Sequence, residues 1–241
     1  MISKRQTKLI TSLNKKKYRD AHNLLVAESP KVIRELISEG LELVELYTTD
    51  SANWSSIPHT VITESDLKKI STLKTPDNAL AVFKKPIVPP ISETGLTLAL
   101  DGIRDPGNLG TLIRLCDWFG VADLVCSQDT VDCYNPKVVQ ASMGSIARVS
   151  IHYLDLKVYL HESTRSIFGG FMDGTSIYQI NLPEDGILVL GNEANGICPE
   201  IEKLITQRIA IPQYGETKRT ESLNVATAGA ILLNEFRRNY R

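Results

Sequence analysis

Apolar segments of strand length alternate with amphipathic segments of helix length from residue 96 onward. The segment 96–103 ("LTLALDGI") is almost continuously apolar, as expected for a strand that helices cover on both faces. Further strands are predicted at 122–127, 147–154, 166–172, 186–191 and 208–212, and helices at 108–119, 135–144, 155–163, 199–206 and from 222 onward. This alternation predicts an α/β fold with a parallel sheet, in which ligands bind at the carboxyl ends of the strands.

A second, smaller α/β unit is predicted before a proline-rich stretch, "KKPIVPPISETG". A helix is expected over 29–40, with Ser29 as N-cap, Pro30 in the first turn and Gly40 as terminator. Strands are expected at 23–29, 41–49, 60–63 and 79–85, and a second helix at 64–72. The predicted domains are therefore 1–85 and 96–241, joined by a stiff linker over 86–95.

The charge is distributed unevenly although the net charge is only −1. The first nineteen residues contain no acidic side chain and seven basic ones: Lys4, Arg5, Lys8, Lys15, Lys16, Lys17 and Arg19. The chain also ends on a basic segment, 237–241. Two interpretations remain open, a surface that contacts RNA phosphates and frayed, solubilising ends.

The composition, with 42% apolar and 23% charged residues, is that of an ordinary globular protein. We see neither a membrane span nor a signal peptide, so we predict a cytoplasmic protein without membrane contact. The four cysteines form no CxxC pair and are expected to be reduced thiols of the core. No His or Cys cluster has metal-ligand spacing, and neither a Walker loop, a GxGxxG turn nor a GxSxG elbow is present. These absences argue against nucleotide-dependent dehydrogenases, P-loop enzymes and serine hydrolases.

Three loops that follow predicted strands carry polar side chains. In "DGIRDPGNLGTLIRLCDWFG" (101–120), helical spacing places Arg114 opposite the apolar stripe, on the side of Gly110 and Asp117. On its own this loop is most simply a capped helix with Asn108 as N-cap and Arg114 as a surface charge. In "GNEANG" (191–196), a tight turn explains the glycines but not the carboxylate of Glu193 at the end of an apolar strand, which favours a functional site.

The third loop, "IPQYGETKRTESLNVATAGAILL" (211–233), opens the last predicted helix. Ser222 is the expected N-cap of this helix, and its apolar stripe is Val225, Ala228, Leu232 and Phe236. Small residues in its first half allow another backbone to approach closely. We interpret Ala228 and Gly229 as ordinary packing residues.

Taken together, "DPGNLGTLIRLCDWFGV", "LVLGNEANGI" and "IPQYGETKRTESLNVATAGAILL" resemble the three signature motifs of the SpoU/TrmH family of RNA 2′-O-ribose methyltransferases, in the SPOUT superfamily. The segment "NPKVVQASMGSIARV" is similar to the helix between the family's motifs, and residues 1–85 resemble its L30e-like substrate-binding domain. The resemblance implies a trefoil-knotted methyltransferase domain, S-adenosylmethionine (AdoMet) as methyl donor, no metal, and a homodimer with its site near the subunit interface.

The resemblance also implies roles for individual residues. Those matching the family's catalytic positions are Arg114, Asn108, Glu193, Ser222 and Asn224. Those matching its cofactor pocket are Leu190, Gly191, Asn192, Gly196, Ile211, Pro212 and Leu223. Because an arginine is normally protonated, Arg114 is expected to orient the RNA through a phosphate or hydroxyl contact rather than to abstract a proton.

Two departures from the family pattern lie close to these residues. Ala194 stands where most members have glycine, so its backbone must avoid strongly positive φ. The loop 213–221 is longer than usual, and its Lys218 and Arg219 are candidates for contacting RNA or covering the cofactor.

The implied reaction is methyl transfer from AdoMet to a ribose 2′-hydroxyl in RNA, with ribosomal RNA favoured over tRNA because of the L30e-like domain. Two alternatives stay open. One is a SPOUT enzyme that methylates an RNA base, and the other is a non-catalytic RNA-binding or ribosome-assembly factor.

Overall fold

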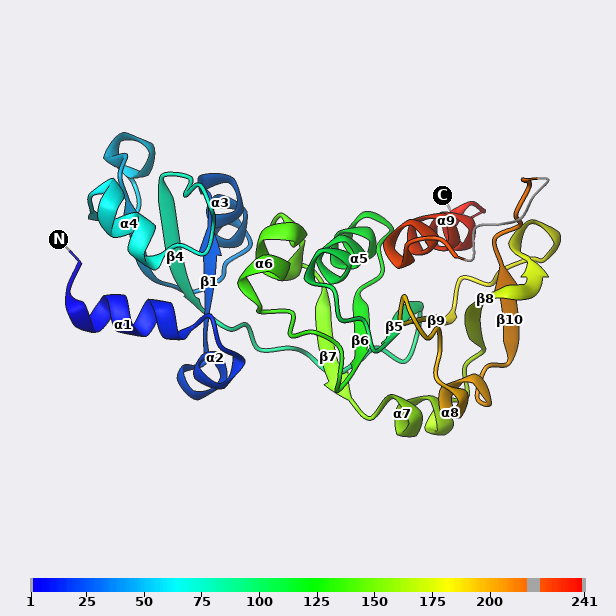
Figure 1. Cartoon of the computed structure of the whole chain (residues 1–241). Helices are drawn as coiled ribbons and strands as arrows, with labels where there is room; N and C mark the ends of the chain where they lie inside the picture. Colours follow the sequence, from blue (N-terminus) through cyan, green and yellow to red (C-terminus); the bar gives the residue numbers. More distant parts are fainter. Residues whose placement is uncertain (1, 216–221, 240–241) are drawn as a thin grey trace. The chain divides into compact units, whose positions relative to one another are not determined.

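The computed structural model describes residues 2–215 and 222–239. Its contacts divide the chain into two compact units. The N-terminal unit comprises residues 1–87 and 132–148, and the C-terminal unit comprises residues 88–131 and 149–241. Figure 1 shows the helices and strands of both units.

The N-terminal unit is built on a four-stranded mixed sheet in the order β1-β4-β2-β3. Strands β1 and β2 are each antiparallel to β4, and β3 is parallel to β2. The elements are α1 (Lys4–Ser12), α2 (Lys16–His22), β1 (Leu24–Glu28), α3 (Pro30–Ser38), β2 (Leu43–Thr48), η1 (Ser51–Trp54), β3 (Thr60–Val61), α4 (Glu64–Ile70) and β4 (Ala79–Lys84). The strands and helices predicted for this part of the chain are thus present, with shorter bounds.

The basic N-terminal segment is helical, so the expectation of a frayed end is wrong for its described residues. Helix α1 starts with a capping box between Ser3 and Gln6. Its apolar side is anchored because Ile10 and Leu13 are buried in the same cluster as β1 and β4 residues. Ser29 occupies the predicted N-cap of α3 but makes no side-chain cap, because its φ of 71° lies outside the extended region that capping requires.

The segment 132–148 packs with the N-terminal unit, although along the chain it connects two strands of the C-terminal sheet. It contains α6 (Pro136–Ser142) and η2 (Ser145–Ala147). Two ion-pair groups hold it: Arg19 bonds Asp132 at 2.5 Å, and Arg148 bonds Glu35 at 3.3 Å and Glu39 at 2.9 Å. From the sequence alone, this segment is assigned to the predicted domain 96–241. The predicted division into domains 1–85 and 96–241 stays a prediction as far as function is concerned.

The C-terminal unit contains the predicted parallel sheet. Six strands lie in the order β10-β8-β9-β5-β6-β7, and every neighbouring pair is parallel. The strands are β5 (Leu96–Asp101), β6 (Asp123–Ser127), β7 (Ser150–Leu154), β8 (Ile167–Ser176), β9 (Gly186–Gly191) and β10 (Gln207–Ala210). The helical elements are α5 (Pro106–Trp118), α7 (Leu156–Glu162), η3 (Ile177–Gln179), α8 (Pro199–Glu202) and α9 (Val225–Arg237).

Helices cover both faces of this sheet, with α5 and α9 on one side and α7 and α8 on the other (Figure 1). Alternate residues of the central strands therefore enter different cores. Ile187 and Val189 of β9 join the cluster of α7 and α8, whereas Leu190 lies against α9, near Gly229. No described helix is both long and apolar enough to cross a membrane.

Two helices begin at residues other than those predicted. The N-cap of α5 is Asp105, whose Oδ1 accepts a hydrogen bond from the backbone N–H of Asn108 at 2.8 Å. The N-cap of α9 is Asn224, not Ser222, and its Oδ1 accepts from two backbone N–H groups, those of Ala226 and Thr227. In α9 the buried stripe includes Val225, Leu232 and Phe236 as predicted, whereas Ala228 is only half-buried.

The prediction of free core thiols is confirmed for Cys116, Cys126 and Cys133, which are buried, whereas Cys198 is free but only half-buried. Burial raises the pKa of the Cys116 thiol, and the same cause raises that of Cys198, which lies beside Asp101. Both thiols are therefore protonated at neutral pH.

Candidate functional site

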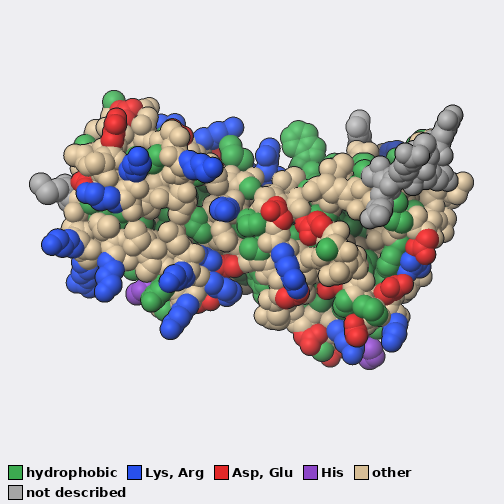
Figure 2. All heavy atoms as spheres, in the orientation of Figure 1, with side chains coloured by type: hydrophobic (Ala, Val, Ile, Leu, Met, Phe, Trp, Pro, Cys, Tyr) green, Lys and Arg blue, Asp and Glu red, His purple; other side chains and the backbone are tan. Residues whose placement is uncertain are grey.

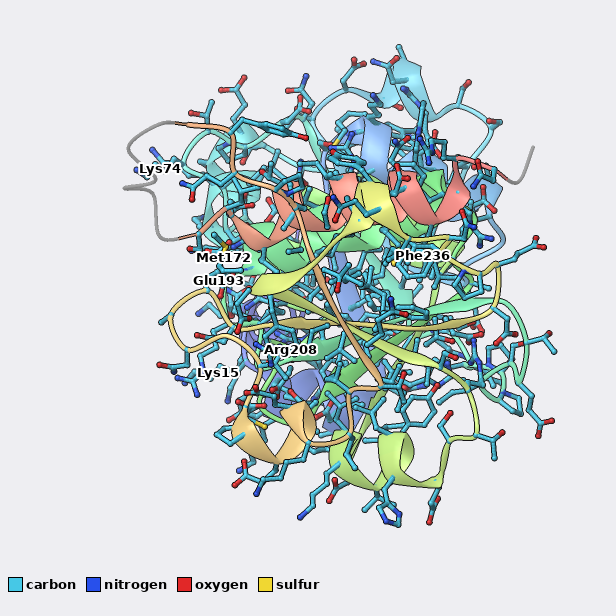
Figure 3. The ribbon with its side chains drawn as sticks, turned by 90° about the vertical axis from the view of Figure 1, so that its right-hand side faces the viewer. Lys15, Lys74, Met172, Glu193, Arg208 and Phe236 are labelled. Atoms are coloured by element: carbon cyan, nitrogen blue, oxygen red, sulfur yellow. The ribbon has the colours of Figure 1, made fainter. Side chains whose placement is uncertain are left out.

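A cavity of about 730 Å³ opens at the carboxyl ends of the C-terminal strands. Four chain segments form its wall: part of β8, the loop after β9, the end of β10 with the residues that follow it, and the start of α9. Met172 and Glu193, which both line the cavity and are both exposed, are labelled in Figure 3. Its position agrees with the general placement of ligand sites in parallel sheets.

The loop after β9 is held in a compact turn. The backbones of Asn192 and Gly196 exchange two hydrogen bonds, of 2.9 and 2.8 Å. The Asn192 amide donates to the Gly102 carbonyl at 2.6 Å, and its Oδ1 accepts from the backbone N–H of Ala194 at 2.9 Å. Ala194 has no positive φ, as its side chain requires.

Gly191 allows this turn to close. A Cβ atom at this position would lie 2.2 Å from the backbone of Gly196 and Ile197. Neither contact could be relieved by a side-chain rotation, so a larger residue would force the two backbones apart.

The polar side chains of the three loops join in one hydrogen-bonded chain. Asn108, in the first turn of α5, donates through Nδ2 to Glu193 Oε1 at 2.5 Å. Asn224, at the N-terminus of α9, donates through Nδ2 to Asn108 Oδ1 at 2.9 Å. Because Asp105 caps α5, the Asn108 side chain is available for both bonds. The hydrogen bond from Asn108 gives the Glu193 carboxylate a partner. It therefore accounts for a carboxylate at this position, which the tight turn alone does not explain.

The remaining predicted catalytic residues are placed differently. Ser222 lines the cavity and is exposed. Arg114 is exposed on α5, is not among the described residues that line the cavity, and makes no hydrogen bond or ion pair with any of them. Gly110, predicted to share its side of the helix, is buried. Lys218 and Arg219 lie outside the described residues.

All seven residues predicted to bind the cofactor lie in the wall of the cavity. Leu190 and Ile211 contribute apolar side chains, and Gly191 and Gly196, which carry no side chain, allow a ligand to approach the backbone closely. An adenosine-containing ligand needs such a combination of apolar walls for the base and convergent polar groups for orientation. The volume and the mixed apolar and polar lining therefore fit AdoMet.

Several lining residues were not predicted to belong to a binding site, namely Gly170, Phe171, Met172, Ala228 and Leu232. The first three lie where the pairing of β8 with β10 slips by five residues, since Arg208 pairs with Gly169 but Ile209 pairs with Thr175. The slip forces β8 to bulge into the cavity. Adjacent glycines in the predicted strand 166–172 were the available signal, because glycine inside a strand marks bulges and close backbone approach.

Among the described residues that line this cavity, Glu193 alone has an acidic side chain. No group of three or more His, Cys, Asp or Glu side chains arranged to hold a metal ion occurs within the described ranges.

Two protein-family models match the sequence. The model of the SpoU rRNA Methylase family matches residues 95–234, more than half of the chain. The model of the MRM3-like substrate binding domain matches residues 4–81, where the sequence analysis expects a substrate-binding domain.

Known relatives match almost the whole chain. The 23S rRNA (guanosine(2553)-2′-O)-methyltransferase RlmP of Bacillus subtilis (strain 168) is 27% identical over 234 residues, covering 93% of each protein. A solved TrmH-family structure from Porphyromonas gingivalis is 40% identical, with a TM-score of 0.89 and 99% coverage of both chains. An AdoMet-bound rRNA methyltransferase from Sinorhizobium meliloti is 26% identical, with a TM-score of 0.87, covering 100% of this chain and 98% of that one.

Proposed function

Since the chain belongs to the SpoU rRNA methylase family, we propose that it transfers a methyl group from AdoMet to a ribose 2′-hydroxyl in ribosomal RNA. The name of the Bacillus subtilis relative supports a guanosine as the methylated nucleotide. The AdoMet-bound Sinorhizobium meliloti structure supports the methyl donor.

The observation that carries this proposal is the chain Glu193–Asn108–Asn224 at the edge of the cavity. A ribose hydroxyl is a weak nucleophile, so its placement relative to the methyl donor supplies much of the rate enhancement. When bound, AdoMet supplies an electrophilic methyl group on a positively charged sulfur, and this chemistry requires no metal ion. Two hydrogen bonds orient the Asn108 amide, one from its Nδ2 to Glu193 and one to its Oδ1 from Asn224. The second hydrogen of Nδ2 would donate to the hydroxyl or to the neighbouring phosphate.

The other roles follow from position in the wall. Leu190, Ile211 and Leu223 would hold the adenine and its ribose through apolar contact and main-chain groups. Asn192 would act through the turn that it stabilises rather than by direct contact, because its amide and its Oδ1 are already engaged. Gly196 and Pro212 would shape the entrance.

We further propose a homodimer in which Arg114 serves the cavity of the partner subunit. Arg114 is exposed and outside the wall of its own cavity. Trp118 follows it by one helical turn, so the two share a face of α5, and Trp118 is 83% exposed. A large exposed aromatic side chain beside an exposed arginine is typical of a protein–protein interface.

The reaction is tested with AdoMet carrying a labelled methyl group. The protein is incubated separately with ribosomal RNA and tRNA from cells that lack the gene, and the digested products are examined for 2′-O-methyl nucleosides. We expect label as a ribose methyl in ribosomal RNA. Label on a base would overturn the chemistry, and label in tRNA alone would overturn the substrate.

The role of Arg114 is tested in the same assay. We expect Arg114→Ala to fold and to bind AdoMet normally but to lose methyl transfer by at least about 100-fold, the range seen when a positioning group is removed. Lys157→Ala, which removes another exposed cation of the same unit, is the control. Full activity of Arg114→Ala would exclude the proposed role.

A further inference from the structure

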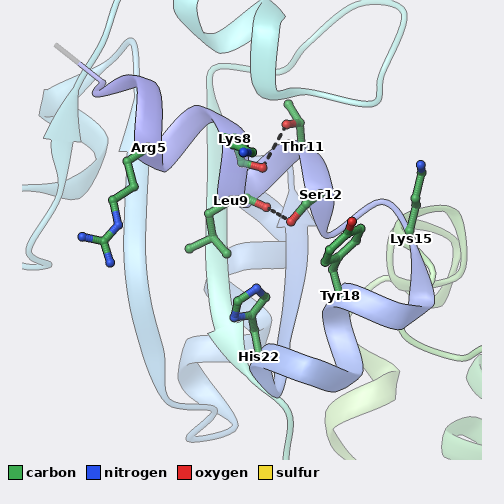
Figure 4. A pocket seen from close by; sticks show the side chains of 8 residues that line it. All are labelled: Arg5, Lys8, Leu9, Thr11, Ser12, Lys15, Tyr18 and His22. Atoms are coloured by element: carbon green, nitrogen blue, oxygen red, sulfur yellow. Dashed lines mark hydrogen bonds between the residues drawn. The ribbon is translucent and has the colours of Figure 1, made fainter.

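A second hollow, of about 470 Å³, lies between α1 and α2 of the N-terminal unit. Its lining residues are Arg5, Lys8, Leu9, Thr11, Ser12, Lys15, Tyr18 and His22. They recur at helical spacing, three or four residues apart, so each helix turns one face towards the hollow (Figure 4). The hollow is therefore built by the meeting of two helices and not by a loop.

The charge of the hollow is entirely positive among its lining residues. Arg5, Lys8 and Lys15 are exposed, and their side chains form no hydrogen bond or ion pair with any residue in the described ranges. No carboxylate lines the hollow, and the nearest acidic residue along the chain, Asp20, is paired with Lys16 at 2.7 Å and with Lys85 at 2.5 Å. Figure 2 shows Lys and Arg side chains gathered over this part of the N-terminal unit.

An aromatic ring lies among these cations. Tyr18 is 39% exposed, and it lies with His22 on the side of α2 that faces Leu9 and Ser12 (Figure 4). The hydroxyls of Thr11 and Ser12 donate to backbone carbonyls of α1 at 2.8 and 2.6 Å, so their remaining capacity towards a ligand is that of acceptors. Base rings stack on such exposed aromatics, whereas flanking Lys and Arg bind the phosphates.

The two helices that form the hollow are anchored to the core of the N-terminal unit. Leu9 is partly buried and packs against the core formed by residues of β1 and β4. On α2, Arg19 is 2% exposed and donates to the Leu13 carbonyl at 2.7 Å and to Asp132. These contacts tie both helices and the turn between them to the same body, so the backbone positions that carry the cations and the ring keep their spacing.

We propose that this hollow binds an unpaired nucleotide of the RNA substrate, with its base stacked on Tyr18 and its phosphates held by Arg5, Lys8 and Lys15. This inference rests on the proposed function and specifies its substrate: a single-stranded or looped region, contacted apart from the methylated ribose. A duplex fits less well, because its bases are already stacked and its aromatic-accessible faces are covered.

The test measures binding of the full chain to two oligomers of equal charge, a single-stranded RNA and an abasic phosphodiester of the same length. We expect the RNA to bind about tenfold more tightly than the abasic oligomer. Tyr18→Leu should abolish that difference, whereas Tyr18→Phe should keep it. An unchanged difference in Tyr18→Leu would overturn the stacking proposal.

The phosphate contacts are tested by salt dependence. The variant with Arg5→Ala, Lys8→Ala and Lys15→Ala together should lower the slope of log K against log salt by about 2, since each contact with a single strand contributes about 0.7. Lys31→Ala, an exposed lysine of α3 outside the hollow, should not change the slope. If a poly-glutamate peptide competes as well as RNA of equal charge, the surface binds acidic protein and the proposal is wrong.

A kinetic measurement separates this inference from the proposed function. With ribosomal RNA as substrate, Tyr18→Leu should raise KM about tenfold and leave kcat and AdoMet affinity unchanged. If the wild-type protein methylates ribosomal RNA and Tyr18→Leu has the wild-type KM, the inference fails and the function stands. If the wild-type protein transfers no methyl group but discriminates RNA from the abasic oligomer through Tyr18, the proposed methyl-transfer function is wrong. The proposal that the hollow binds a nucleotide is then still supported.

Discussion

Asn108 lies at the centre of the polar chain that joins the three loops of the C-terminal unit. It donates to Glu193 and accepts from Asn224, so its orientation depends on groups about 85 and 116 residues away in sequence. A side chain held by two hydrogen bonds loses little further freedom when it binds a substrate, which is the physical advantage of such preorganisation.

Asn224 has two separable tasks, which two substitutions distinguish. Its Oδ1 caps α9 and its Nδ2 orients Asn108. We expect Asn224→Ala to lower the free energy of unfolding by about 0.5–2 kcal/mol and to impair methyl transfer. Asn224→Asp keeps the capping oxygen but loses the donor, so it should retain stability and still impair transfer. Urea unfolding and single-turnover kinetics measure the two effects, and full transfer by Asn224→Asp would show that the donor is dispensable.

Gly191 should tolerate no side chain. In Gly191→Ala the new Cβ would overlap the backbone of Gly196 and Ile197, so we expect a loss of about 1–3 kcal/mol of stability and loss of AdoMet binding. The matched control is Gly120→Ala, where φ is +64° and nothing lies within 4 Å. Strain there should cost about 1–2 kcal/mol without changing AdoMet affinity. Calorimetric titration decides, and normal binding by Gly191→Ala would contradict the proposed role of the turn.

At the scale of elements, α6 belongs by its contacts to the N-terminal unit. The buried pair of Arg19 and Asp132 anchors the segment that carries it, with exposures of 2% and 10%. Removing one partner of such a pair leaves an uncompensated buried charge, which costs more than the pair itself contributes.

We therefore expect Asp132→Ala to lower the free energy of unfolding by about 3–5 kcal/mol and to increase amide hydrogen exchange in α6. The control is Glu42→Ala, which removes the exposed pair with Lys84, whose exposures are 53% for Lys84 and 63% for Glu42. That change should cost at most about 1 kcal/mol. Equal effects of the two substitutions would mean that the Arg19 pair does not anchor the segment.

At the scale of the whole molecule, the proposed dimer makes a distinct prediction. Trp118→Asp should reduce dimerisation by placing a charge in an apolar contact, and sedimentation velocity would then show monomers. Methyl transfer should fall with dimerisation, while AdoMet binding persists. A wild-type protein that sediments as a monomer at assay concentration would contradict the proposal.

Mixed dimers test whether the site is shared between subunits. One protomer carries Arg114→Ala and the other Gly191→Ala, so each alone is expected to be inactive. If Arg114 serves the partner's cavity, one site of each mixed dimer contains an intact cavity and an intact arginine, and activity returns. If Arg114 serves its own cavity, no intact site exists and the mixture stays inactive.

The parts of the fold that depend on local sequence pattern could be predicted from the amino-acid sequence alone. The apolar segments 96–103 and 186–191 predicted buried parallel strands, and β5 and β9 are such strands. These strands could be predicted because the hydrophobic periodicity and composition that favour a strand are contained within a few consecutive residues. The predicted cofactor residues also lie together in the cavity wall, because their loops follow strands of one parallel sheet. The trefoil threading and the individual roles stay predictions.

Features that depend on contacts between distant segments could not be predicted from local pattern. The N-caps of α5 and α9 are Asp105 and Asn224 and not the predicted residues. Several residues near each helix start can serve as N-cap, and packing selects among them. The bulge of β8 into the cavity depends on the register of β10, and the placement of 132–148 depends on Arg19, 113 residues from Asp132. Contacts at such separations leave no periodic trace in the sequence, because they are set by which surfaces meet when the chain has folded.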